Sequence, residues 1–338
     1  MAKAVKPDAP SKSETLESPS ESAGAIDYCI DGASIKVTWM RFPPRDTAGT
    51  IERIHSDAVI FLLPGWGYTE SATSTAAVSQ AFADVSGNVV YALDTYTERI
   101  APYVAHREAQ AARKFIEAVP AARRVLVGQS QGGWAAMCIA ASCADITGLV
   151  LVDSMGMVTR TLGQFLVDYV KENVNSTFLV GYSAEPHYDV NNLRAVNARY
   201  LKEGIGEIAR QIRLAGGVLS YAARLSKEVR GMVVQNPCAR ELTLPIVIIN
   251  GEQDKLSRPG RIIPVEHPSA NGSSYIASLK ERERYLRNRV FPRSPYIRMI
   301  VARKLGYHGL VAFRPLEVAR TSLYLLERWE RANTDLLR

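Results

Sequence analysis

A serine flanked by glycines at fixed spacing is the pattern in this sequence most able to carry chemistry. Residues 128–132 read Gly-Gln-Ser-Gln-Gly, between an apolar run and a stretch of helical composition. A G-x-S-x-G turn is so sharp that side chains at Gly128 and Gly132 would collide with neighbouring backbone, while the serine is held at the top of a sheet. The pattern predicts a nucleophile elbow at Ser130. The alternative is a tight structural turn with a locally satisfied serine hydroxyl.

A nucleophilic serine needs a general base, and the base needs an orienting acid. Of the five histidines, only His308 comes just after the last apolar run that predicts a strand. Asp254 follows the run at 245–251 and is the predicted acid. Asp153 also ends a predicted strand and is the rival acid, otherwise a structural carboxylate. The arrangement predicts acyl chemistry in which His308 takes the proton of Ser130.

Acyl transfer also needs hydrogen-bond donors aimed at the developing oxyanion. Residues 64–67, Pro-Gly-Trp-Gly, follow an earlier apolar run. They predict a turn that directs the backbone N–H of Trp66 into the pocket. The N–H of Gln131, at the start of the next helix, is the second predicted donor. The alternative is a plain Pro-Gly turn.

Six compact apolar runs must position these residues. They read AVIFLLP, NVVYALD, RVLVGQS, GLVLVDS, PIVIING and YIRMIVA, and helical segments separate them. Runs this hydrophobic are buried on both faces of a sheet, which predicts an α/β fold with a mainly parallel sheet and helices on both faces. Active sites of such sheets form at the carboxyl ends of the strands. Ser130, Asp254 and His308 all follow such ends.

The rest of the chain predicts a tail, a hairpin and an inserted domain. Residues 1–25 are rich in Ser, Glu, Lys and Pro and predict a disordered tail. A hairpin at the sheet edge is predicted to turn at Asp31-Gly32. Residues 156–241 far exceed an ordinary connection of about two to six residues and carry apolar residues at helical spacing. They predict a helical cap between core segments 26–155 and 242–338.

Composition narrows the function classes. The chain of 338 residues is 47% hydrophobic and 22% charged, which is typical of a globular protein. Four cysteines without CxxC pairs predict neither a disulfide framework nor a zinc site and favour a reducing compartment. The apolar segments are too short to span a membrane, and the N-terminus has no apolar signal region, so we expect a cytoplasmic protein.

Neither a cofactor nor a nucleic-acid partner is expected. The sequence contains no G-x-x-x-x-G-K phosphate loop and no G-x-G-x-x-G dinucleotide motif. The formal charge is +7, and basic residues concentrate at 280–304, but glutamates interleave with them. Interleaved charges of this kind predict a solvated helix face rather than a binding surface.

The order Ser130, Asp254, His308, with a serine elbow and a helical insertion before the acid, resembles the α/β-hydrolase fold family. The likeness covers residues 26–335. It implies a mostly parallel sheet of about eight strands with a cap, and the roles of nucleophile, acid and base for these three residues. It also implies an esterase- or lipase-like serine hydrolase that forms an acyl-enzyme with a small-molecule substrate.

Two motifs depart from the pattern of that family. Trp66 and Gln131 match the two oxyanion donors of the family. However, Pro64-Gly65 stands before Trp66, where many members with a cap have His-Gly. Backbone donation survives this change. Residues 94–97, Asp-Thr-Tyr-Thr, replace the D-x-x-G-x-G loop of the commonest subgroups. The resemblance therefore leaves the subfamily and the substrate open.

Three other functions remain compatible with the same residues, because a fold does not fix a function. The triad would also serve an acyltransferase, a thioesterase or an amidase, which product analysis separates. A ligand-sensing protein with slow turnover is the second alternative. A scaffold with an inactive site is the third.

Overall fold

The computed structural model of the chain describes most of the predicted core. The described residues are 22–45, 58–65, 73–96, 105–157, 159, 161, 163–165, 167–168, 202, 209, 212–213, 216–217, 219–220, 223, 234–252, 254, 272–302 and 310–334. Trp66, His308, residues 1–21 and most of the predicted cap lie outside the described residues. The helical cap therefore stays a prediction.

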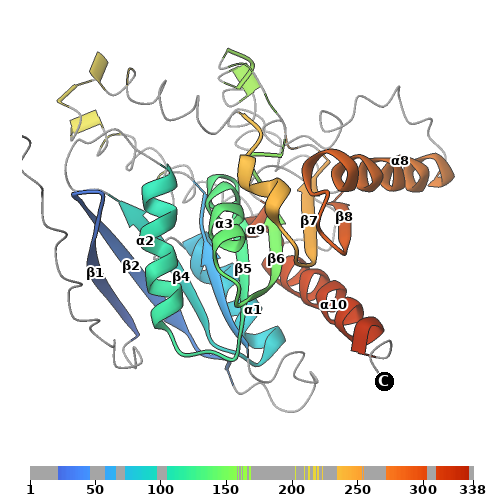
Figure 1. Cartoon of the computed structure of the whole chain (residues 1–338), viewed down its shortest axis with the longest axis horizontal. Helices are drawn as coiled ribbons and strands as arrows, with labels where there is room; N and C mark the ends of the chain where they lie inside the picture. The colour runs from blue at the N-terminus through green and yellow to red at the C-terminus, as the bar shows by residue number, and fades with distance from the viewer. Residues whose placement is uncertain are drawn as a thin grey trace, which may run out of the picture.

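An eight-stranded sheet forms the centre of the molecule, in the order β1-β2-β4-β3-β5-β6-β7-β8 (Figure 1). The strands are β1 (Ala23–Ile30), β2 (Ala33–Phe42), β3 (Ala58–Leu63), β4 (Val90–Tyr96), β5 (Arg123–Gln129), β6 (Ile146–Val152), β7 (Ile246–Gly251) and β8 (Ile297–Ala302). β2 runs antiparallel to β1 and β4, and the other pairs are parallel. This confirms the predicted mainly parallel sheet.

The predicted edge hairpin is formed by β1 and β2. Ile30 pairs with Ala33, so the turn consists of Asp31 and Gly32. Both have positive φ, 47° and 74°. A two-residue turn with two positive φ angles matches the twist of the flanking strands, and Asp-Gly is well suited to it. Local turn chemistry thus fixes the register of this edge.

Successive side chains of a strand point to opposite faces of the sheet, and in the central strands both sets are buried. In β5, Leu126 belongs to one hydrophobic cluster, while Val125 and Val127 belong to the other. On the first face lie α2 (Ala105–Ala118) and α3 (Gln131–Ser142). On the second lie α1 (Thr73–Ser86), α9 (Leu310–Phe313) and α10 (Pro315–Thr334), as Figure 1 shows. The helices therefore cover both faces, as predicted.

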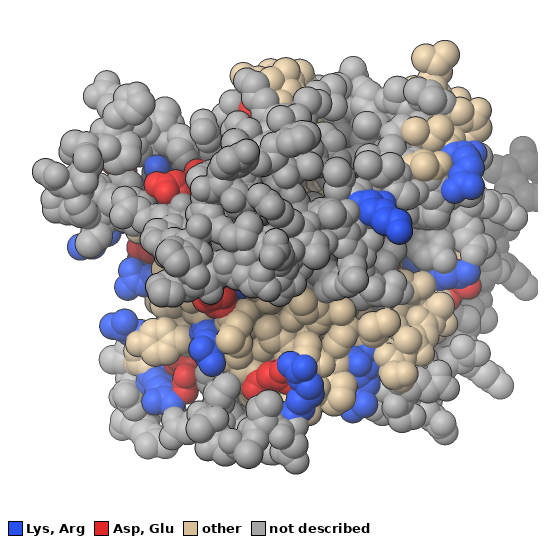
Figure 2. All heavy atoms as spheres, turned by 180° about the vertical axis from the view of Figure 1, so that it is seen from behind, with Lys and Arg blue, Asp and Glu red and all other residues tan. Residues whose placement is uncertain are grey.

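The C-terminal half adds one α-helix and two short helical turns beside β7 and β8. They are the 3₁₀-helix η1 (Pro237–Glu241), α8 (Gly272–Tyr285) and the π-helical turn η2 (Leu286–Val290). Arg298 of β8 forms an ion pair with Glu283 of α8 at 3.1 Å. Figure 2 shows basic and acidic side chains interspersed on the described surface seen from behind. No described helix has both the length and the apolar character needed to cross a membrane.

Candidate functional site

Ser130 lies in the turn between β5 and α3 in a backbone conformation unusual for serine, with φ 50° and ψ −115°. Its N–H donates to the carbonyl of Val152 at 3.0 Å. Its carbonyl accepts from the N–H groups of Gly133 at 3.1 Å and Met155 at 2.9 Å. Residues with positive φ persist only where their surroundings over-determine them. Here β6 and the first turn of α3 hold the strained residue.

The glycines around Ser130 are required by close backbone approach rather than by positive φ. A Cβ at Gly128 would lie 2.5 Å from the Cα of Gly133, and one at Gly132 would lie 2.1 Å from the carbonyl oxygen of Leu63. A Cβ at Gly133 would lie 2.0 Å from the hydroxyl oxygen of Ser154. The collisions expected at Gly128 and Gly132 are therefore present. The contact with Ser154 has no signal in the sequence.

The turn after β3 abuts the serine. A Cβ at Gly65 would lie 3.0 Å from the Cβ of Ser130 and 3.6 Å from its hydroxyl oxygen. Gln131, the other predicted oxyanion donor, is the first residue of α3. The structure thus brings the residue before Trp66 into contact with Ser130, the predicted nucleophile, while Trp66 itself lies outside the described residues.

Two buried carboxylates lie just past the ends of neighbouring strands. Asp254 follows β7, is 0% exposed, and donates its N–H to the carbonyl of Gly251 at 3.2 Å. Asp153 follows β6, is also 0% exposed, and has φ 46°. Its N–H donates to the carbonyl of Ile249 at 2.9 Å. Both predicted acids therefore occupy the carboxyl edge of the sheet.

The Asp153 carboxylate joins three elements. One oxygen, Oδ1, accepts from the N–H of Gly251 at 2.9 Å, and the other, Oδ2, accepts from the N–H of Leu310 at 3.3 Å. β6 is thereby tied to the end of β7 and to the first residue of α9. Leu310 comes two positions after His308, which lies outside the described residues. Strand-end position is the only sequence signal for this role.

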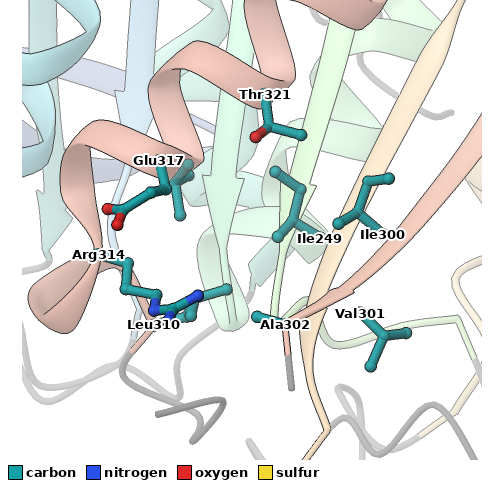
Figure 3. Close-up of a pocket in the computed structure, with 9 residues that line it drawn as sticks. Ile249, Ile300, Val301, Ala302, Leu310, Arg314, Glu317 and Thr321 are labelled. Atoms are coloured by element: carbon teal, nitrogen blue, oxygen red, sulfur yellow. The ribbon is translucent and has the colours of Figure 1, made fainter. Parts of the chain in front are cut away.

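A cavity of about 240 Å³ lies between the ends of β7 and β8 and the helices α9 and α10 (Figure 3). Its described lining residues are Ile249, Ile300, Val301, Ala302, Leu310, Arg314, Glu317, Val318 and Thr321. The lining is mainly apolar, and Ser130 is not part of it. Among the described residues, no three His, Cys, Asp or Glu side chains gather as metal ligands would.

Comparison with known proteins identifies the family. The model of the alpha/beta hydrolase family matches residues 59–321. Similar solved structures include an esterase from Thermogutta terrifontis, with a TM-score of 0.53, 14% identity, and coverage of 92% of this chain and 99% of that one. A probable hydrolytic enzyme from Pseudomonas aeruginosa has a TM-score of 0.51, 16% identity and 94% coverage of both chains.

The enol-lactonase from Burkholderia xenovorans has a TM-score of 0.51 and 14% identity, with 89% of this chain and 99% of that one covered. At such identities the likeness shows the fold alone. No curated protein sequence matches significantly. Because the family model spans most of the chain, over the same sheet that carries the serine turn, the protein belongs to the alpha/beta hydrolase family.

Proposed function

We propose that this protein is a serine hydrolase that cleaves a carboxylic ester or a related acyl compound. Ser130 attacks the carbonyl carbon while neutral His308 takes its proton, and Asp254 orients the histidine and stabilises the imidazolium that forms. His308 then gives the proton to the leaving group. Water activated by the same histidine releases the acyl group from Ser130.

The strained turn at Ser130 is the observation that carries the proposal. A serine with φ 50° between a parallel strand and a helix is turned out of the strand, and three backbone hydrogen bonds hold it there. Strain of this kind costs on the order of 1–3 kcal/mol, and it recurs at active sites, where it presents a reacting group.

The anchoring of Leu310 supports His308 as the base. Two peptide units separate these residues, so their Cα atoms are at most about 7.6 Å apart. Leu310 donates its N–H to Asp153, the residue that follows β6. Leu310 is thus held at the strand ends, where Ser130 also lies, and this supports the proposal that His308, two positions earlier in the chain, acts there.

Burial supports Asp254 as the acid. A fully buried carboxylate is stable only with hydrogen-bond partners, and an imidazole N–H is a suitable one. Asp153 uses both carboxylate oxygens to hold backbone N–H groups. We therefore assign Asp254 to the triad and Asp153 to the support of the neighbouring loop.

Two backbone N–H groups form the proposed oxyanion hole. Gln131 supplies one from the first turn of α3, where the helix dipole favours negative charge. Trp66 supplies the other, and the contact of Gly65 with Ser130 supports its proximity. The similar structures named as an esterase and an enol-lactonase support an ester-type substrate.

A fluorophosphonate probe tests the nucleophile directly. The wild-type protein is expected to be labelled, and mass spectrometry is expected to locate the label on Ser130. Ser130→Ala should abolish labelling, because the attacking oxygen is lost. Ser142→Ala is the matched control, since the Ser142 hydroxyl lies at the other end of α3 and bonds only backbone carbonyls among the contacts found, at 3.0 and 3.1 Å.

The proposal fails if folded wild-type protein is not labelled, or if Ser130→Ala is labelled as strongly as the control. Thermal unfolding establishes that each variant is folded. If the wild-type protein is labelled, its rates with esters and thioesters of graded chain length then define the acyl group that it accepts.

A further inference from the structure

Two cysteines lie on helix α3 and on η1, which contact each other. Cys138 belongs to α3 and is buried, and Cys238 belongs to η1 and is half-buried. They stand one hundred positions apart in the sequence, so no spacing motif relates them. The contact joins the helix that follows Ser130 to the segment that leads into β7.

Asn236 organises this contact. It is fully buried, and its Oδ1 accepts from the backbone N–H of Cys238 at 2.9 Å and lies 3.7 Å from the Cys138 sulfur. Its Nδ2 donates to the carbonyl of Trp134 at 2.8 Å and lies 3.4 Å from the Cys138 sulfur. The backbone N–H of Asn236 donates to the carbonyl of Gly156 at 2.8 Å. One side chain thus fixes both cysteine positions.

The two thiols interact directly and unequally. A hydrogen bond from the Cys138 thiol to the Cys238 sulfur lowers the pKa of Cys238 to about 7. The same hydrogen bond, together with burial, raises the pKa of Cys138. The half-buried Cys238 sulfur is therefore the more readily ionised of the two, while the buried Cys138 favours its protonated form. A thiolate beside a second thiol is the arrangement of an oxidisable cysteine with a resolving cysteine.

The other two cysteines lack this environment. Cys143 is buried near the end of α3, and burial raises the pKa of its thiol. Cys29 is exposed on the edge strand β1. Since the structure describes all four cysteines of the chain, it singles out Cys138 and Cys238 as the pair placed to react with each other.

We propose that Cys138 and Cys238 form a redox site that hydroperoxides convert to a disulfide. The Cys238 thiolate attacks the terminal peroxide oxygen, the O–O bond breaks, and the released alkoxide or hydroxide takes up a proton. Cys238 is then a sulfenic acid. The Cys138 sulfur attacks it, an S–S bond forms, and the hydroxyl leaves as water with the Cys138 proton. Two thiols are oxidised as one hydroperoxide is reduced to an alcohol, or to water, and a second water.

The disulfide would link the elbow helix to the chain entering β7. It closes a covalent loop that contains β6 and the long insertion between β6 and η1. The proposed redox site therefore lies outside the proposed triad. It does not depend on the proposed hydrolase activity, because the cysteines touch none of the triad residues in the described contacts.

Peptide mapping tests the proposal. The full chain is treated with hydrogen peroxide at neutral pH, free thiols are blocked with N-ethylmaleimide, and the protein is digested with trypsin without reductant. Trypsin places Cys238 in peptide 231–240 and Cys138 in peptide 125–160, together with Cys143. We expect these two peptides to be joined, with a mass lower by two hydrogens than their sum, and to separate after treatment with dithiothreitol.

Matched variants assign the bond. Cys138→Ala is expected to abolish the cross-link, whereas Cys143→Ala, on the same peptide just past the end of α3, should retain it. Cys238→Ala provides an independent test if Cys138→Ala does not fold. The proposal is overturned if wild-type peptide 231–240 is recovered unlinked and blocked by N-ethylmaleimide after oxidation, or if the cross-link survives in Cys138→Ala.

Discussion

Ser130 and Asp153 share an unusual backbone at the ends of neighbouring strands. Among the described residues, three non-glycine residues have positive φ: Asp31 in the hairpin, Ser130 after β5 and Asp153 after β6. Ser130 donates its N–H to the last residue of β6, and Asp153 donates to Ile249 of β7. The strained residues are therefore linked through consecutive strands. At the scale of single residues, two of these three positions thus lie at the strand ends where the chemistry is proposed, and the third belongs to the hairpin turn.

The two buried carboxylates are expected to respond differently to the same substitution. Asp254→Asn removes the charge that stabilises the imidazolium and should lower kcat by about 10³- to 10⁴-fold. Asp153→Asn keeps a residue that tolerates positive φ but turns an amide N–H toward a backbone N–H, and it should cost about 1–3 kcal/mol of unfolding free energy. Ester kinetics and urea unfolding of both variants separate the roles. A large loss of kcat in Asp153→Asn alone would instead assign Asp153 as the acid of the triad and Asp254 as the structural carboxylate.

The Cys238 thiol is expected to become reactive as pH rises through about 7. The Cys138 hydrogen bond favours the thiolate and lowers the pKa of Cys238 from 9.0 to about 7, while Glu241 in η1 opposes this shift. Alkylation by iodoacetamide, followed on peptide 231–240, should therefore reach half its maximal rate near that pH. In Cys138→Ala the donor is absent, so the profile should move to higher pH. An unchanged profile would contradict the assigned cause.

At the scale of elements, α3 approaches β3, β5 and β6 closely because Gly132 and Gly133 in its first turn have no side chains. Gly132 lies against the end of β3, and Gly133 lies against Ser154 after β6. The alternation of β5 buries both of its faces, so the strand cannot move aside. The direction of the Ser130 turn thus depends on helix packing as much as on local backbone preference.

A double-mutant cycle between Gly133 and Ser154 tests this packing. Gly133→Ala should lower the free energy of unfolding by about 1–3 kcal/mol, because its Cβ would overlap the Ser154 side chain. Ser154→Gly removes the overlapping atoms, so Gly133→Ala should cost much less in that background. Gly163→Ala is the control, since a Cβ there would meet no atom within 4 Å. Equal costs in the two backgrounds would exclude the steric explanation.

At the scale of the whole molecule, the contact of α3 with η1 closes the chain over the insertion between β6 and β7. Asn236 bonds Gly156 and Trp134, so the two ends of the insertion meet on the elbow helix. A covalent bond at this point restricts the unfolded chain over a long loop, and the entropic gain increases with loop length. The oxidised protein is expected to be more stable than the reduced protein.

The gain should be about 2–4 kcal/mol of unfolding free energy. Urea unfolding of the wild-type protein before and after hydrogen peroxide measures it. Cys138→Ala, treated in the same way, should show no gain. Equal stability of the oxidised and reduced wild-type proteins, with the disulfide mapped, would show that the bond strains the folded state.

The sequence by itself determined the strands, the edge hairpin and the glycine-lined turn of Ser130. Each depends on information local in the chain. Apolar runs bounded by turn residues form buried strands, Asp31-Gly32 suits a two-residue turn, and glycines on both sides of a serine permit a sharp strand-to-helix turn. The family resemblance supplied the strand number, whereas the prediction of Asp254 as the acid came from its place just after a predicted strand.

Only the tertiary structure decided which distant residues meet. The contact of Gly65 with Ser130, the ties from Asp153 to Gly251 and Leu310, and the pairing of Cys138 with Cys238 all join separate segments. No periodicity encodes these contacts, because they depend on the order of strands in the sheet and on where each crossover returns. The reactivity proposed for Cys238 likewise depends on folding, because only folding brings the Cys138 thiol to it.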